Sequence, residues 1–186
     1  TLGINLYQLA VAFPIPIILA LMMNEVKNNK FKRTVQTVTY APHFISTVVL
    51  VGMVVSFLSP STGIINMFIK ALGFQPISFM TEPKWFKTIY VFSGIWQNMG
   101  WNSIIYMAAL AGIAPELHEA AIVDGASRTQ RIWHINIPGI LPTIIIMFIM
   151  ETGKIMNVGF EKAFLMQNDL NISSSDVIST YVYRSG

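Results

Sequence analysis

No cysteine occurs among the 186 residues of this chain. That absence excludes a disulfide framework, a thiolate metal site and a cysteine nucleophile. Charged residues make up only 11% of the chain, whereas an ordinary soluble domain carries roughly a quarter. The net charge of +3 is small and dispersed, which argues against a surface that binds nucleic acid.

Two catalytic motifs are also missing. No Gly-x-x-x-x-Gly-Lys-Ser/Thr segment occurs, so the chain cannot itself cradle the phosphates of ATP. His118 and Glu119 begin a zinc-protease pattern, but the second histidine would have to stand where Ile122 is. The sequence therefore excludes a P-loop nucleotide site and this type of zinc site.

Apolar sequence is abundant, because 53% of the residues are hydrophobic. A helix of about 20 apolar residues crosses roughly 30 Å of hydrocarbon. Pro14 and Pro16 fall inside the first apolar run, where a membrane bundle can re-satisfy the freed carbonyls. The sequence predicts an all-α, polytopic membrane helix bundle with about four spans, at residues 2–23, 35–58 and 86–113 and after Pro138 and Pro142.

The segment between the first two predicted spans fixes their direction. Residues 24–33 carry four cations and one acid, and short loops rich in Lys and Arg stay in the cytoplasm. The spans therefore run inward, outward, inward and outward. Residues 64–72 are too short to cross, and we expect a helix at the outer interface there, with an external loop at residues 166–175.

The two ends of the chain carry no recognisable terminal feature. The first apolar run lacks a charged leader with a small-residue cleavage site, so it does not have the pattern of a signal peptide. We expect residues 1–186 to form a single transmembrane domain that is incomplete at both ends. We also expect that it does not fold alone, because its spans need absent helices to pack against.

An ordered polar segment lies between the third and fourth predicted spans. Pro115 suits the first turn of a helix, and Gly125 can end that helix in a left-handed conformation. Ser127 can cap a second short helix, from Arg128 to His134, that stops before Pro138. The pattern predicts a helical elbow along the membrane face, in residues 114–137.

This segment resembles the loop motif of ABC-importer permeases. Glu119-Ala120-Ala121 is followed after three residues by Gly125, and nine residues later by Ile135-Asn136-Ile137-Pro138, where Ile137 replaces the usual Leu. Further stretches resemble the subgroup that imports complex oligosaccharides in Gram-positive bacteria. They are residues 20–26, 40–46, 157–161 and 180–184.

The resemblance implies a type I ABC-importer permease core in the bacterial plasma membrane. Its partners would be ABC ATPase subunits, a second and non-identical permease subunit, an extracellular substrate-binding lipoprotein and membrane lipid, with no nucleic acid. The chain itself would be no enzyme and hold no cofactor, since ATP and Mg²⁺ would bind the ATPase. The residues expected to couple to the ATPase are Glu119, Ala120, Ala121, Asp124, Gly125, Arg128 and Arg131.

Polar and aromatic residues in two spans are candidates for a substrate path. Flat apolar rings with amide groups beside them suit sugar rings and their hydroxyls, and charges inside a span indicate function. Glu151 should lie about 15 Å into its span, with Lys154 on the same helix face. The full set is Trp96, Gln97, Asn98, Trp101, Asn102, Glu151, Lys154, Asn157 and Phe160.

Blander interpretations of the same residues stay open. The tryptophans and amides are also typical of interfacial anchors and helix–helix hydrogen bonds, and Glu151 and Lys154 could simply neutralise each other. The solute could instead be a simple sugar or a polyol. An ion-coupled transporter would leave the coupling loop without a role, and an intramembrane enzyme would need a nucleophile–base pair that no span shows.

Overall fold

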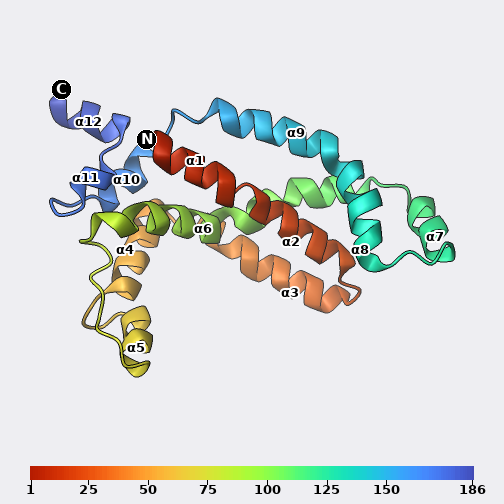
Figure 1. Ribbon diagram of the computed structural model, residues 1–186, viewed down its shortest axis with the longest axis horizontal. Coiled ribbons are helices and arrows are strands. Elements are labelled where there is room, and N and C mark those ends of the chain that lie inside the picture. Colours follow the sequence, from red (N-terminus) through yellow and green to blue (C-terminus); the bar gives the residue numbers. More distant parts are fainter. The chain divides into compact units, whose positions relative to one another are not determined.

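The computed structural model describes all 186 residues, and every element in it is helical. Figure 1 labels the α-helices. The elements are α1 (Leu2–Val11), α2 (Pro14–Glu25), α3 (Asn29–Tyr40), η1 (Ala41–Phe44), α4 (Thr47–Leu58), α5 (Ile64–Ala71), α6 (Pro83–Ala111), α7 (Pro115–Val123), α8 (Arg128–Arg131), η2 (Ile132–Asn136), α9 (Ile137–Gly153), α10 (Phe160–Met166), α11 (Ile172–Ser175) and α12 (Ile178–Ser185).

The chain divides into two compact units, each built from several separate segments. Unit 1 contains residues 1–8, 44–95 and 155–186, and unit 2 contains residues 9–43 and 96–154. The predicted all-α membrane fold is confirmed. The long helix α6 contributes its first half to unit 1 and its second half to unit 2.

The core of unit 2 is apolar and joins α2, α6 and α9. Ala20 and Leu21 pack with Tyr106, Leu110 and Ile140, and all five side chains are buried. Gly139 lets α9 come close to the end of this cluster, because a Cβ on Gly139 would overlap the Ile113 side chain.

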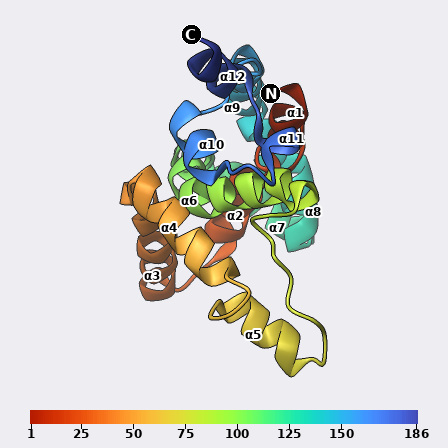
Figure 2. The same ribbon diagram turned by 90° about the vertical axis from the view of Figure 1, so that its left-hand side faces the viewer.

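Unit 1 combines an apolar interior with buried polar ties. The side chain of Asn66 in α5 donates to the carbonyls of Leu58, Ser59 and Ile77 and accepts from the Ile77 N–H at 2.8 Å. Asn66 is 1% exposed. Its hydrogen bonds tie the end of α4 to the loop that follows α5. Figure 2 shows α4 and α5 following one another along an arm.

Another tie in unit 1 holds α10 against the first half of α6. The Lys162 ammonium donates to the Tyr90 carbonyl at 2.8 Å and lies 4.6 Å from the centre of the Tyr90 ring. A Cβ on Gly94 would come within 3.2 Å of the same ammonium nitrogen. Lys162 therefore occupies space that a glycine leaves open on α6.

Proline positions explain where the predicted spans are interrupted. The first span breaks between α1 and α2, where Pro14 takes the first position of the second helix. The second span is not one helix from residue 35, because η1 with buried Pro42 separates α3 from α4. The helix α5 lies where the sequence predicts it, and α6 covers nearly the predicted third span.

Three local predictions were wrong. The basic segment 24–33 is not all loop, since α3 already begins at Asn29, after Asn28 accepts hydrogen bonds from the Lys30 and Phe31 N–H groups. The segment after Ser127 does not stop before Pro138 but continues as α8, η2 and α9. The polar segment 166–175 includes the short helix α11 instead of being all loop.

The number of apolar spans is smaller than the predicted four. By length and composition, two helices can cross a membrane, residues 2–25 and 128–153, with a third if the interrupted pair α3 and α4 is one span. At 29 residues α6 is long enough, but it is not among these candidates. Its polar residues, which include Gln97, Asn98 and Asn102, lower its hydropathy.

Candidate functional site

The loop after α6 is ordered by backbone hydrogen bonds that its own sequence dictates. Pro115 occupies the first turn of α7, and Gly125 follows that helix with a φ of 77°. The Ala126 N–H donates to the Ala121 carbonyl at 2.8 Å, and the Gly125 N–H donates to the Ile122 carbonyl at 3.0 Å. This pair of bonds is a Schellman motif, so the predicted left-handed stop at Gly125 is confirmed.

A reciprocal cap starts the next helix directly after that turn. The Gln130 N–H donates to Oγ of Ser127 at 3.3 Å, and the Ser127 N–H donates to Oε1 of Gln130 at 2.7 Å. Backbone groups at the end of α7 and at the start of α8 therefore find their hydrogen-bond partners within the elbow itself. The predicted cap at Ser127 is confirmed.

The elbow presents its predicted coupling residues to the surface. Glu119, Ala120, Asp124, Gly125 and Arg128 are exposed, whereas Ala121 and Arg131 are half-buried. Their role in coupling stays a prediction, because no partner chain is present.

Sequence reasoning missed an apolar part of the elbow surface. Leu117 and Ile122 are more than half exposed, and Val123 is 86% exposed. These three residues form what we call the elbow patch. The available signal was the apolar pair Ile122 and Val123 at the end of α7, close to the Gly125 turn.

The elbow leads without interruption into a long helix. After α8, five residues adopt the wider π-helical turn η2, and α9 follows at once with Pro138 in its first turn. A backbone N–H in the first turn of a helix has no partner within that helix. Proline lacks this N–H, so Pro138 at the start of α9 costs no hydrogen bond. Within η2, the buried side chain of Asn136 has no hydrogen-bond partner at either its amide nitrogen or its oxygen.

Two residues of the predicted substrate path, Asn98 and Trp101, contact His43 in unit 2. Nδ1 of His43 lies 3.0 Å from Oδ1 of Asn98, and the His43 ring stacks on Trp101 with centroids 4.5 Å apart and planes only 4° from parallel. His43, which lies 55 residues before Asn98, was missed by sequence reasoning. The only available signal was its place beside Pro42, at a break in an apolar run.

The other predicted residues of the substrate path lie on α6 and in unit 1. Trp96 and Asn102 are exposed, and Gln97 is half-buried. Asn157 and Phe160 belong to unit 1, where Phe160 packs with Phe164 and Tyr183 at centroid distances of 5.3 Å each. The role of these residues in substrate binding stays a prediction.

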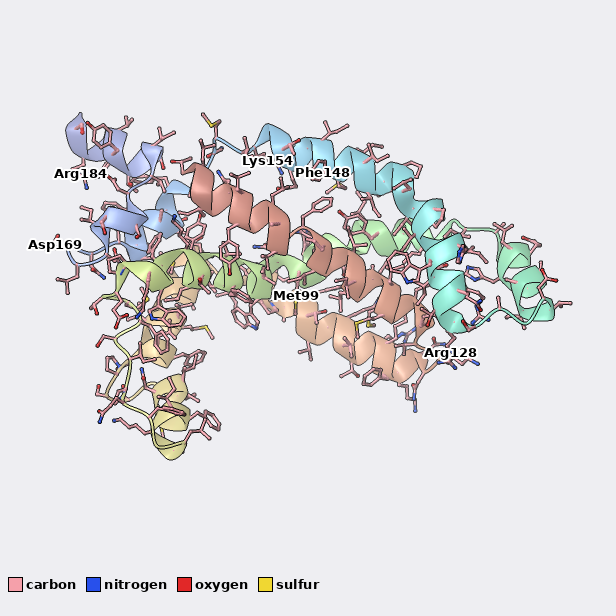
Figure 3. All side chains as sticks on the ribbon, viewed as in Figure 1. Met99, Arg128, Phe148, Lys154, Asp169 and Arg184 are labelled. Atoms are coloured by element: carbon pink, nitrogen blue, oxygen red, sulfur yellow. The ribbon has the colours of Figure 1, made fainter.

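Glu151 and Lys154 form the pair that their spacing predicts, with 2.9 Å between Oε1 and Nζ. The helix that carries Glu151 begins at Arg128 and ends at Gly153, so Glu151 stands near its last turn. The depth of Glu151 in the membrane stays a prediction. Figure 3 shows Arg128 and Lys154 at opposite ends of this helix.

Comparisons with known proteins indicate the class of molecule. Residues 12–185 match the model of the family described as the binding-protein-dependent transport system inner membrane component. Two proteins of Bacillus subtilis (strain 168) match over the whole chain and 58% of their own length. LplB is 44% identical, and the polygalacturonan/rhamnogalacturonan transport system permease protein YteP is 40% identical.

A solved structure is similar over nearly the whole chain. It is a bacterial ABC transporter involved in the import of the acidic polysaccharide alginate, with 46% identity and a TM-score of 0.95. The likeness covers 98% of this chain and 64% of the solved one, so this chain spans less than two thirds of its relatives. With the elbow geometry, these matches place the chain in the family of binding-protein-dependent transport system inner membrane components, the permease subunits of ABC importers.

Proposed function

We propose that this chain is part of the membrane-spanning subunit of an ATP-driven importer of oligosaccharides. The similarity to the polygalacturonan/rhamnogalacturonan transport system permease protein YteP, and to the arabinooligosaccharides transport system permease protein AraP at 28% identity, supports a sugar chain as the substrate. The observation that carries the proposal is the elbow, an ordered and exposed structure that would lie in the cytoplasm and would have no role in a transporter driven by an ion gradient.

The elbow is where a separate ATPase would dock. The Schellman motif and the Ser127 cap fix the angle between α7 and α8, and the elbow patch offers apolar area at the tip. Exposed apolar side chains surrounded by charges are typical of a protein interface. Glu119 would contact the ATPase, with Asp124, Arg128 and Arg131 around it, and ATP and Mg²⁺ would bind on that partner.

The sugar would move past the polar side of α6. Trp101 and Asn98 form a platform with an aromatic face and an amide group, and the two groups are one helical turn apart. Trp96, Gln97 and Asn102 extend it along the helix, and Glu151 with Lys154 supplies a charged pair in the same unit. Asn157 and Phe160 would contribute once the complete path is assembled.

The remaining partners follow from the type of importer. A second, similar but non-identical permease subunit would form the other half of the path, in the plasma membrane of a bacterium. An extracellular binding lipoprotein would deliver the sugar. A solved relative in complex with an alginate pentasaccharide-bound periplasmic protein, 46% identical to this chain, supports this last partner.

The test is uptake by cells that carry the full-length permease. The probes are labelled alginate pentasaccharide, oligogalacturonides and arabino-oligosaccharides, compared between wild type, Gly125→Asp and Glu119→Lys. We expect both variants to remain in the membrane, lose uptake and lose the ATPase in a pull-down, because one distorts the elbow and the other reverses a charge on it. If both variants transport normally and retain the ATPase, the elbow is only a connector.

A further substitution separates docking from folding of the elbow. Val123→Asp places a charge on the elbow patch, and Thr129→Asp places the same charge on the neighbouring exposed turn of α8. We expect only Val123→Asp to weaken co-purification of the ATPase. Equal loss in both variants would mean that added charge, and not the patch, disturbs the complex.

A further inference from the structure

We infer that the start of α3 binds the headgroups of anionic phospholipids and thereby anchors this end of the helix at one face of the membrane. The binding surface is the basic patch, which consists of Lys27, Lys30, Lys32 and Arg33. Such binding requires only a chain that spans a membrane, and it is independent of the solute that the transporter carries.

The four cations of the basic patch have no acidic partner in the chain. None of the three ion pairs in the structure involves a residue of the patch. Lys27, Lys30 and Arg33 are exposed, and Lys32 is half-buried. Glu25 is the one acid in residues 24–33, and it is not in an ion pair either. The patch therefore presents four positive charges that the protein does not neutralise.

The position of these cations on α3 opposes the stability of the helix itself. Lys30 and Lys32 lie in the first turn of α3, which contains no acidic residue. The start of a helix carries a partial positive charge, so cations are unfavourable there and anions are favourable. Asn28 caps the helix with its side-chain oxygen, but it brings no negative charge. An anion from outside the chain would relieve both the repulsion between the cations and their conflict with the helix end.

An apolar face on the same helix indicates that this anion belongs to a lipid. Phe31, Val35 and Val38 follow one another at intervals of four and three, the repeat of one helix face, which we call the α3 stripe. Phe31 is 56% exposed and Val38 is 65% exposed, so the protein leaves this face largely uncovered. Exposed apolar groups beside cations are typical of a membrane surface, where the apolar groups enter the hydrocarbon and the cations reach the headgroups.

The other side of α3 contacts protein and so fixes which way the α3 stripe faces. Gln36 and Tyr40 each place a polar atom 3.7 Å from Sδ of Met107 in α6. At 3.6 residues per turn, these two residues lie about 150° around the helix from the centre of the stripe. The stripe therefore faces away from α6. It begins at Phe31, level with the basic patch, and Val38 lies about 10 Å farther along the axis, so a lipid bound by its headgroup can lay its acyl chains along the stripe.

The chain also places the basic patch at the edge of the hydrocarbon. Residues 2–25 are long and apolar enough to cross a membrane, and Lys27 stands two residues beyond their end. Lysine and arginine directly after a span lie at the level of the headgroups, where each cation adds to the binding of anionic lipids. The orientation predicted from the sequence puts this patch in the cytoplasmic leaflet.

The test measures binding of labelled phospholipid to the full-length permease, purified in detergent micelles with the subunits that co-purify with it. The probes are pyrene-labelled phosphatidylglycerol, which is anionic, and pyrene-labelled phosphatidylcholine, which is zwitterionic, and energy transfer from the protein reports binding. We expect wild type to bind phosphatidylglycerol about tenfold more tightly or better. Added salt should narrow that difference, because it screens exposed charges.

Two variants with an equal loss of charge locate the binding site. Lys30→Gln/Arg33→Gln removes two exposed cations of the basic patch, and Lys70→Gln/Lys87→Gln removes two exposed cations of unit 1. We expect about tenfold weaker binding of phosphatidylglycerol for the first variant and no change for the second. Lys30→Arg/Arg33→Lys keeps both charges and should bind as wild type does.

A third variant separates the α3 stripe from the charges. Phe31→Ser removes apolar contact and leaves all four cations of the basic patch in place. We expect weaker binding of both lipids by a similar factor, because their acyl chains are alike. An unchanged affinity for both lipids would contradict the placement of the acyl chains along the stripe.

Other outcomes would overturn the assignment of the basic patch to lipid. Equal binding of the two lipids to wild type would do so, as would an equal loss in the two variants that remove charge. Full competition by inorganic phosphate, which has the charge but no acyl chain, would show a site for small anions instead. If Lys30→Gln/Arg33→Gln kept its lipid affinity but lost the ATPase in a pull-down, the patch would be a protein contact.

Discussion

The elbow and the α3–α6 contact are both well-ordered parts of unit 2, but their order has different origins. By the α3–α6 contact we mean the set of contacts in which Gln36, Thr39, Tyr40 and His43 meet Asn98, Gly100 and Met107. In the elbow, each decisive hydrogen bond joins residues no more than five positions apart, through the Gly125 turn and the Ser127 cap. In the α3–α6 contact, the partners are separated by 55 to 71 residues. The elbow therefore depends on local sequence, whereas the α3–α6 contact depends on packing of the whole unit.

The first prediction concerns unit 1, where Asn66 bonds to residues 7 to 11 positions away, farther along the sequence than the hydrogen bonds of the elbow reach. Asn66→Leu keeps most of the volume but leaves the buried groups around it without their amide partner, at roughly 1–3 kcal/mol for each group that water cannot reach. We expect the largest fall in the midpoint of thermal unfolding of the purified full-length permease. Asn28→Leu, which removes an exposed cap instead, is the control. A smaller fall for Asn66→Leu than for Asn28→Leu would contradict this ranking.

The second prediction concerns the closest approach in the α3–α6 contact. Gly100→Ala adds a Cβ that overlaps the Thr39 carbonyl, and overpacking of this kind costs about 1–3 kcal/mol. Gly52→Ala is the matched control, because a Cβ there meets nothing within 4 Å. Alanine is also a better helix former than glycine, so Gly52→Ala should be neutral or slightly stabilising. Equal unfolding midpoints for the two variants would show that α3 shifts without cost.

The third prediction addresses the local order of the elbow. Gly125 has a φ of 77°, and a side chain there costs about 1–2 kcal/mol. Because the elbow is exposed, Gly125→Ala should hardly change the unfolding midpoint of the permease but should weaken ATPase co-purification. Gly125→Asn, which tolerates the left-handed region better, should restore part of it. A large fall in the unfolding midpoint would mean that the elbow also supports the core of unit 2.

The smallest expected effect belongs to a surface pair near the end of the chain. Burial alone would raise the pKa of Asp176, but hydrogen bonds from Arg184 at 2.7 Å and Thr180 at 3.0 Å outweigh it and lower that pKa. The stabilisation is therefore complete above the ordinary aspartate value of about 4 and is lost as the pH falls below it. Asp176→Asn should remove less than about 1 kcal/mol at pH 7 and nothing at low pH. A difference between wild type and variant that grows on acidification would have the wrong sign.

The sequence predicted those features whose causes are local. Pro115, Gly125 and Ser127 each carry a backbone preference that acts on their own turn, and the structure confirms all three. The pair of Glu151 and Lys154 follows from a spacing of three residues on a helix. The all-α membrane fold follows from the apolar composition.

Features that depend on distant contacts were not predicted. Nothing near residue 43 indicates that its ring stacks on Trp101, because the partner is supplied by another helix. Pro138 was expected to end a helix, but the wider turn η2 and the first-turn position remove the conflict. The helix that carries Glu151 begins at Arg128, earlier than the start after Pro138 that the sequence predicted.

The continuous path from Arg128 to Gly153 has a mechanical consequence. A helix of 26 residues is about 39 Å long, with the elbow at one end and the Glu151–Lys154 pair near the other. A displacement of the elbow end would therefore move the charged end as well, because between them the helix departs from regular α geometry only at η2. The wider turn and the unpartnered amide of Asn136 favour bending at η2, close to the elbow.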